Sequence, residues 1–436
     1  MKDLTKGNVY RNLTGFAIPI LAGNLLQLTY NAVDSIVVGR YAGETALAAV
    51  GICSPVMSIV ILGASGVSIG ASAYMGQCYG ARKMKELKQS FASVMILSLL
   101  MSLVILALCM VFCHPLLTLL QVPPEARDMT EQYLRIVLLS FPFTFLYNVL
   151  TASLRSIGDS RTPILFLGIS CVINVILDII LVRQFHLSVA GAGAATLFAE
   201  AVSCVLCLIH VYRNVPVFSL KRNEWTPDKD IMKLILQNGS ITAFQQLMQP
   251  IGKLLIQGCI NSYGVSIIAA FNAVNRVDDF ACIPEQSISH AIMNYTSQCD
   301  GARNRDKMRE GFRKGMILEL GYGIFICLVI LFFRYPVIRL FGSGTMSEIG
   351  ADYLKVMAVF YLMPAVTNGI QGFFRGIQKM QTTFIATCIQ ITLRVIFVYL
   401  LVPHMGMNGA AYSCAVGWAV MIVYQIVQLK SAKKYI

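Results

Sequence analysis

The chain has 436 residues, of which 56% are hydrophobic and only 13% are charged, about half the charged share of an ordinary globular protein. This composition excludes a disordered chain, which needs low hydrophobicity. The formal charge of +13 would favour a nucleic-acid binder only if the cations lay on a folded polar surface. Uncharged tracts such as residues 94–112 instead indicate a polytopic membrane protein.

Twelve segments are apolar enough to cross a bilayer, which takes about 20 residues per helix. In chain order they are residues 13–38, 46–75, 89–113, 130–152, 163–182, 190–212, 232–262, 266–296, 311–333, 350–373, 382–402 and 408–429. The longest connection contains Pro216, Trp225 and Pro227. We therefore expect an amino-terminal lobe at 1–213, a cytoplasmic linker at 214–231 and a carboxy-terminal lobe at 232–436.

The cations are unevenly distributed among the segments. If both termini are cytoplasmic, 25 of the 35 Lys and Arg residues are inside, 7 are outside, and Lys253, Arg276 and Arg394 lie within spans. Cytoplasmic loops are enriched in these residues. We expect a multi-pass protein of a prokaryotic plasma (inner) membrane with cytoplasmic termini and no nucleic-acid partner. The first apolar stretch is too long for a cleavable signal peptide.

An internal repeat relates the two halves. Residues 77–82 (QCYGAR) recur at 298–303 (QCDGAR), an offset of 221, and further matches follow at offsets of 221, 220 and 216. Each half is therefore one six-helix unit. Because that number is even, the two lobes of this all-α protein should be related by a pseudo-two-fold axis along the membrane normal. Parallel repeats of this kind are a transporter architecture, with the substrate site between the halves.

Polar side chains follow one face of the first span. Asn24, Gln27, Asn31 and Asp34 are spaced by 3, 4 and 3 residues, which places them on one side of a helix. Pro19 precedes them in the same span, where it invites a kink. We hypothesise that a bend at Pro19 moves this polar face.

The amino-terminal lobe concentrates its polar groups at one depth. Asp34 lies six residues before Arg40, about 9 Å from the outer end of its helix. Asp178, Asn174 four residues earlier, and Thr196 of the sixth span fall in the same layer. Ionisable groups inside spans are costly and indicate function by default. Two carboxylates and two neutral oxygens could bind Na⁺ or share a proton, whereas Asn174 or Thr196 alone could equally be a structural polar group.

The carboxy-terminal lobe lacks this pattern, because the offset places Leu255 opposite Asp34. Its span charges are expected to form structural ion pairs, with coupling or substrate contacts as the alternative. One predicted pair is Arg276 with Asp279. Glu319, near the inner end of its span, is expected at the surface.

Glu285 is the remaining acid assigned to an ion pair in this lobe. Its predicted partner is Lys253 of the seventh span or Arg394 of the eleventh.

Several short motifs occur in a fixed order over the spans. They are Pro19 followed by residues 33–39 (VDSIVVG), then 46–51 (ALAAVG), 76–81 (GQCYGA), 154–159 (LRSIGD) and 174–178 (NVILD). In these motifs the chain resembles the multidrug and toxic compound extrusion (MATE) family over essentially its whole length.

The resemblance implies a secondary antiporter that exports organic, often cationic or amphipathic compounds against inward H⁺ or Na⁺. It implies two six-helix lobes around a V-shaped cavity. It also implies a cation site at Asp34, Asn174, Asp178 and Thr196, with the first-span proline at Pro19. One branch of the family uses acids in the seventh and tenth spans for Na⁺, but this sequence has only Gln and Asn there, at Gln245, Gln246, Gln249, Asn368 and Gln371.

We therefore predict a multidrug efflux antiporter that is a monomer in the lipid bilayer and needs no cofactor besides H⁺ or Na⁺. The candidate substrate-cavity residues are Asn24, Gln27, Tyr30, Asn31, Met248, Gln249, Lys253, Glu285 and Arg394. A lipid-linked precursor flippase of the same superfamily is the main alternative. A passive channel remains open, whereas an intramembrane enzyme is disfavoured because no HExxH or Walker A pattern is present.

Overall fold

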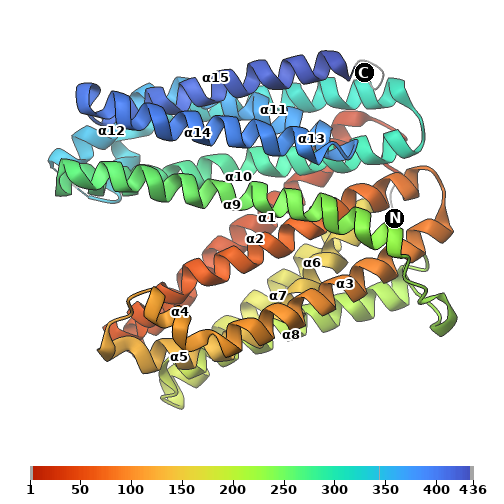
Figure 1. Ribbon diagram of the computed structural model, residues 1–436, viewed down its shortest axis with the longest axis horizontal. Coiled ribbons are helices and arrows are strands. Elements are labelled where there is room, and N and C mark those ends of the chain that lie inside the picture. Colours follow the sequence, from red (N-terminus) through yellow and green to blue (C-terminus); the bar gives the residue numbers. More distant parts are fainter. Residues whose placement is uncertain (1–2, 343, 433–436) are drawn as a thin grey trace. The chain divides into compact units, whose positions relative to one another are not determined.

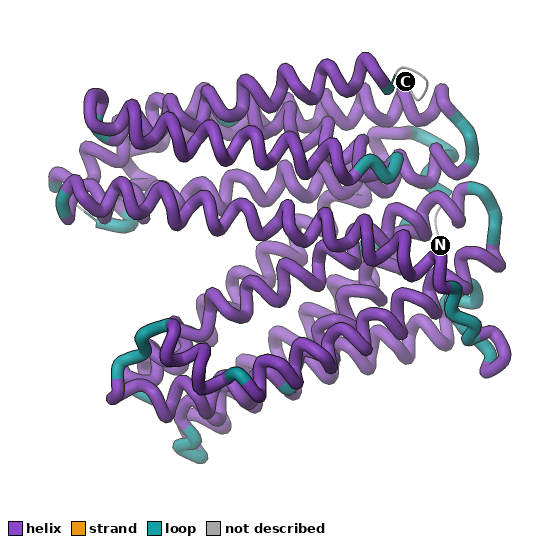
Figure 2. The backbone as a smooth tube through the Cα atoms, viewed as in Figure 1, coloured by secondary structure: helices purple, strands orange, loops and turns teal. Residues whose placement is uncertain are grey.

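The computed structural model of the chain describes residues 3–342 and 344–432. Every regular element within these residues is helical, and short loops join them (Figures 1 and 2). The predicted all-α fold is therefore confirmed. Lys2, Lys433 and Lys434, which we counted among the cytoplasmic cations, lie outside the described residues.

The first half of the chain forms eight α-helices and one π-helical turn. They are α1 (Val9–Tyr41), α2 (Glu44–Gly80), α3 (Met84–Val111), α4 (Cys113–Leu119), α5 (Pro124–Leu138), α6 (Phe141–Ser156), α7 (Arg161–Asp178), the π turn η1 (Ile179–Gln184) and α8 (Ser188–Asn214). The connection to the second half holds the 3₁₀ turn η2 (Arg222–Glu224).

The second half repeats this order. It contains α9 (Lys229–Ile260), the 3₁₀ turn η3 (Asn261–Tyr263), α10 (Val265–Gly301), α11 (Arg305–Arg339), α12 (Thr345–Phe360), α13 (Leu362–Gly376), α14 (Met380–Met405) and α15 (Met407–Ser431). The starts of α2, α3, α5 and α6 recur 221 residues later as the starts of α10, α11, α12 and α13. Gly43 and Gly264, which precede α2 and α10, both adopt positive φ, at 91° and 97°. The sequence repeat is thus a structural repeat.

Within the described residues, eight helices are long and apolar enough to span a membrane, and two bent pairs bring the number to ten. The pairs α5–α6 and α12–α13 bend by 43° and 45° where we predicted single spans. The second helix of each pair carries a proline in its first turn, Pro142 or Pro364, which cannot continue a preceding helix without losing a hydrogen bond. The long but more polar α9 and α10 complete the twelve predicted segments.

Contacts divide the chain into two compact units at points that differ from the predicted lobe boundaries. Among the described residues, unit 1 contains residues 19–243, and unit 2 contains residues 3–18, 244–342 and 344–432. The division falls within α1, at Pro19, and within α9, after Ala243. Both helices therefore contribute residues to both units.

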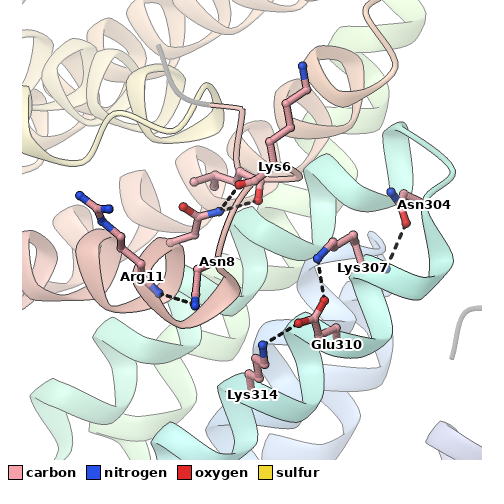
Figure 3. Close-up of polar contacts among 9 residues, drawn as sticks. Lys6, Asn8, Arg11, Asn304, Lys307, Glu310 and Lys314 are labelled. Carbon is pink, nitrogen blue, oxygen red and sulfur yellow. Dashed lines mark hydrogen bonds and ion pairs between the residues drawn. The ribbon is translucent and has the colours of Figure 1, made fainter.

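Residues 3–18 belong to unit 2 because they pack on one end of that unit (Figure 3). The sequence predicts that this end faces the cytoplasm. The backbone N–H of Leu4 donates to Gln298 Oε1 at 2.9 Å, and Lys314 Nζ lies 5.0 Å from the centre of the Tyr10 ring. Close by, Lys314 and Lys307 both bind the Glu310 carboxylate, at 2.6 and 2.8 Å.

The predicted linker is attached to unit 1. Lys88 of α3 forms an ion pair with Glu224 at 2.7 Å, and the backbone N–H of Asp228 donates to Ser93 Oγ at 3.0 Å. The hydrogen bond from Lys88 and one from the Lys221 backbone N–H lower the pKa of Glu224. Residues 214–231 thus form part of a packed unit.

The start of α9 also belongs to unit 1, because small residues bring it against α2. A Cβ added at Gly66 would lie 2.4 Å from the Ala243 backbone nitrogen, and one at Gly70 would lie 3.1 Å from the Gly239 nitrogen. A Cβ at Gly239 would in turn lie 2.7 Å from Val67 Cα. Small residues permit such close helix approach in membranes, and this contact moves the boundary past the linker to residue 243.

Candidate functional site

Two buried carboxyl groups meet inside unit 1. Asp34 of α1 is 7% exposed and Asp178 of α7 is fully buried, and their carboxyl groups lie within hydrogen-bonding reach of each other. Among the described residues, Asp34 Oδ1 and both Asp178 oxygens have no hydrogen-bond donor. Two unpaired carboxylates in a dry interior are strongly unfavourable. The pair therefore requires either a shared proton or a bound cation.

The other two predicted members of this layer lie in the same unit. Asn174, one turn before Asp178 on α7, is fully buried, and neither amide atom has a partner among the described residues. Thr196 of α8 donates to the Ala192 carbonyl at 3.0 Å and is within hydrogen-bonding reach of the Tyr30 hydroxyl. The grouping of these residues by depth thus corresponds to a spatial cluster, whose role as a cation site stays a prediction.

A π turn lies directly after Asp178. Residues 179–184 form η1, and Asp178 is both the last residue of α7 and the N-cap of this turn. π turns are rare and frequent at functional sites. A Cβ at Gly191 would lie 3.1 Å from the Leu181 carbonyl carbon, so glycine allows α8 to approach the turn. The sequence does not reveal this π turn, because its hydrophobic periodicity is the same as that of an ordinary helix.

Two further side chains adjoin the cluster and were not among the predicted site residues. The Tyr133 hydroxyl of α5 is buried and interacts electrostatically with Asp34, Tyr30 and Asp178. Glu200, one turn after Thr196, is within hydrogen-bonding reach of Thr144. Glu200 could have been found from the sequence, because its four-residue spacing from Thr196 places both on one helix face. Tyr133 could be identified only from tertiary contacts.

The candidate substrate-cavity residues fall in different units. On α1, Gln27 and Asn31 are exposed, whereas Tyr30 and Asn24 are half-buried. On α9 of unit 2, Gln249 is exposed and Met248 is half-buried.

The charged residues of unit 2 pair differently from the prediction. Lys253 forms an ion pair with Asp279 at 2.5 Å, in place of the predicted Arg276–Asp279 pair. Asp278 accepts a hydrogen bond from Tyr361 and lies near the half-buried Arg394. The predicted pairing failed because spacing on α10 does not reveal which neighbouring helix faces each side chain.

Glu285 and Glu319 also differ from their predicted settings. Glu285 does not pair with Lys253 or Arg394. It is fully buried, and its Oε2 accepts a hydrogen bond from Asn368 Nδ2 at 3.2 Å. The surface position predicted for Glu319 is wrong, because that residue is also fully buried. Its side chain lies against Gly369 of α13 and interacts electrostatically with Glu285 of α10.

A metal site would depend on neutral ligands. No group of three or more His, Cys, Asp and Glu side chains suited to a metal ion occurs within residues 3–342 and 344–432. In the unit 1 cluster a Na⁺ ion would therefore need the oxygens of Asn174 and Thr196 besides the two carboxylates. The unpartnered Asn174 Oδ1 and Asp178 oxygens fit that chemistry, which hard cations prefer.

The arrangement defines a class of protein: a duplicated, all-helical membrane protein with a buried carboxyl pair among its spans. The family profile MatE matches residues 19–180 and 242–400, and the chain belongs to this family. It is accordingly a membrane transporter of small molecules and not an enzyme.

Relatives align over most of the chain. The probable multidrug resistance protein YpnP of Bacillus subtilis (strain 168) is 27% identical over 93% of this chain and 92% of its own length. YoeA, a second probable multidrug resistance protein of that strain, is 28% identical over 77% and 74%. A solved structure of MATE in the bent conformation covers 100% of this chain and 99% of its own, with a TM-score of 0.93 and 22% identity. That structural likeness supports the fold alone.

Proposed function

We propose that the protein exports organic, cationic or amphipathic compounds in exchange for inward H⁺ or Na⁺. The observation that carries this proposal is the Asp34–Asp178 pair, buried without a compensating cation among the described residues. A site of this kind gains a proton or cation readily when it opens to water and releases it when its surroundings change. The names of the bacterial relatives support multidrug export as the transported class.

The organic compound is exchanged for H⁺ or Na⁺ because the transporter binds the compound with different affinity in its ion-bound and ion-free states. When the outer side is open, H⁺ or Na⁺ enters the cluster and neutralises one carboxylate. That state holds the organic compound less tightly, so the compound leaves outward. The ion-loaded transporter then returns to face the cytoplasm, where it releases the ion and can bind the next organic compound. Coupling requires that substrate and ion favour different states. The protein acts as a monomer in the plasma membrane with cytoplasmic termini, and it requires no organic cofactor.

The direct test uses proteoliposomes loaded with the cationic dye ethidium. One set receives an acidic exterior without sodium, and a second receives external sodium at equal pH on both sides. We expect one gradient to accelerate dye export, which also identifies the ion. Export that is indifferent to both gradients would contradict antiport and favour a passive channel.

The flippase alternative is less well supported. A pyrophosphate-bearing lipid would need unpaired cations. Of the three span cations, Lys253 is paired with Asp279 and Arg394 lies beside Asp278, which leaves only Arg276 without an acidic partner among the described residues. These contacts favour a structural role for Lys253 and Arg394.

Pro19→Ala is expected to reduce dye export several-fold at unchanged protein levels. Pro19 lies inside α1 at the division between the two units, where its missing N–H weakens the helix. A regular helix would resist the bend by which we propose the polar face moves. Export rates and membrane expression of Pro19→Ala and the wild type provide the measurement. If this variant exports dye at the wild-type rate, a bend at Pro19 is not part of the transport mechanism.

A further inference from the structure

A second buried carboxyl pair lies in unit 2, outside the cluster described above. Glu285 of α10 and Glu319 of α11 are both fully buried and interact electrostatically. Helix α13 packs against both through consecutive residues. Asn368 Nδ2 donates to Glu285 Oε2 at 3.2 Å, and a Cβ at Gly369 would lie 3.3 Å from Glu319 Cγ.

The pair has more acceptors than donors. Glu285 Oε1 and both oxygens of Glu319 have no hydrogen-bond partner within the described parts of the chain. Neither carboxyl group forms an ion pair there with Lys, Arg or His.

The neighbouring titratable groups do not supply the missing charge. Cys282 of α10 interacts electrostatically with Glu285, and Tyr322 of α11 interacts with both acids. The Tyr322 hydroxyl donates to the Ala281 carbonyl at 3.0 Å. The residue after α12, Tyr361, donates to Asp278.

We propose that Glu285 and Glu319 form a second proton-binding site, which takes up at least one proton and exchanges it with water during transport. An unpaired carboxylate in a dry interior is costly, and two are more so. One proton removes one of the two charges and relieves the repulsion between the two acids. A metal cation is a poorer occupant because hard cations need more oxygen ligands than this pair provides.

Proton binding at this pair is independent of the proposed antiport, whereas proton exchange rests on it. Glu285 and Glu319 lie on the eighth and ninth predicted spans, not on the seventh and tenth, where one branch of the family has its acids. Asn368 of the tenth span contributes only the hydrogen bond to Glu285. It also explains why two acids are buried in the unit whose sequence has no counterpart of Asp34.

Proton binding is tested by infrared spectroscopy of the purified full-length protein in detergent at neutral pH without sodium. A protonated carboxyl group has a C=O band distinct from that of a carboxylate. We expect such a band to be shifted or lost in Glu285→Gln and in Glu319→Gln, lost in the double variant, and unchanged in Glu348→Gln, which alters an exposed acid of the same unit.

Size-exclusion profiles establish that each variant is folded, and a variant that misfolds is replaced by Glu285→Asp or Glu319→Asp. These conservative variants keep the acid and should shift the band without removing it. A wild-type spectrum whose protonated bands are unchanged by every substitution would overturn the proposal. A band that disappears when sodium is added would overturn it in favour of a sodium site.

Proton exchange is tested by adding ethidium to the protein in weak buffer and recording proton release with a pH dye. Glu319→Gln and Asp34→Asn should each remove part of the release, and the double variant should remove nearly all of it. If Asp34→Asn alone abolishes release, the second pair does not exchange its proton. No release from the wild type, with the infrared band present, would instead contradict proton antiport while leaving the binding site intact.

Discussion

Asp34→Asn and Asp178→Asn are each expected to lower ion-driven dye export on the order of 100-fold, near the upper end of typical coupling between two sites. Asparagine has nearly the same shape as aspartate but carries no charge, so the pair loses one of the two carboxylates that would hold the coupling ion. Export in proteoliposomes, driven by the ion identified with the wild type, gives the measurement.

Asp128→Asn is the matched control, because Asp128 is an exposed acid on α5 of the same unit. This variant should export at the wild-type rate. Each asparagine variant should also keep the wild-type size-exclusion profile, since the substitution removes no hydrogen bond to Asp34 Oδ1 or to Asp178. Coupled export at the wild-type rate in Asp34→Asn would refute the role of this pair.

Gly66→Ala is expected to lower the free energy of unfolding by about 1–3 kcal/mol, the usual cost of overpacking. The new Cβ would lie 2.4 Å from the Ala243 backbone nitrogen. Backbone atoms cannot move aside as a flexible side chain can, so α2 and the start of α9 must separate. The midpoint of thermal unfolding in detergent should fall accordingly.

Gly63→Ala, one turn earlier on α2, separates packing from helix propensity. A Cβ at Gly63 meets nothing within 4 Å. Alanine should therefore stabilise the helix by up to about 1 kcal/mol through its higher propensity. If both variants unfold at the same temperature, the close approach of α2 and α9 does not contribute to stability.

Much of the fold could be predicted because the local composition of the sequence indicates where membrane helices occur. The 221-residue offset, read from matches such as QCYGAR and QCDGAR, recurs in the helix starts. Pro142 and Pro364 each invite a kink, and the bends before α6 and α13 lie beside them, but a proline alone does not distinguish a kink within one span from a break between two helices. The boundaries of the two compact units depend on packing of residues 3–18 and 229–243, which no local pattern reveals.

For the candidate site, helical spacing and depth identified Asp34, Asn174, Asp178 and Thr196, which lie in one unit. The same reasoning failed for Glu319 and for the partner of Asp279. Depth along a helix follows from counting residues at a fixed rise. The direction in which a side chain faces depends on how each helix is rotated against its neighbours.

The sequence by itself therefore determined the membrane class, the duplication, the helical segments and the shared depth of the two aspartates, because hydrophobicity and periodicity are local properties. The tertiary structure alone decided that α9 begins in unit 1, that Lys253 pairs with Asp279, and that Glu285 and Glu319 are buried together. These contacts join residues distant in the chain, and they arise from close helix packing that no local pattern encodes.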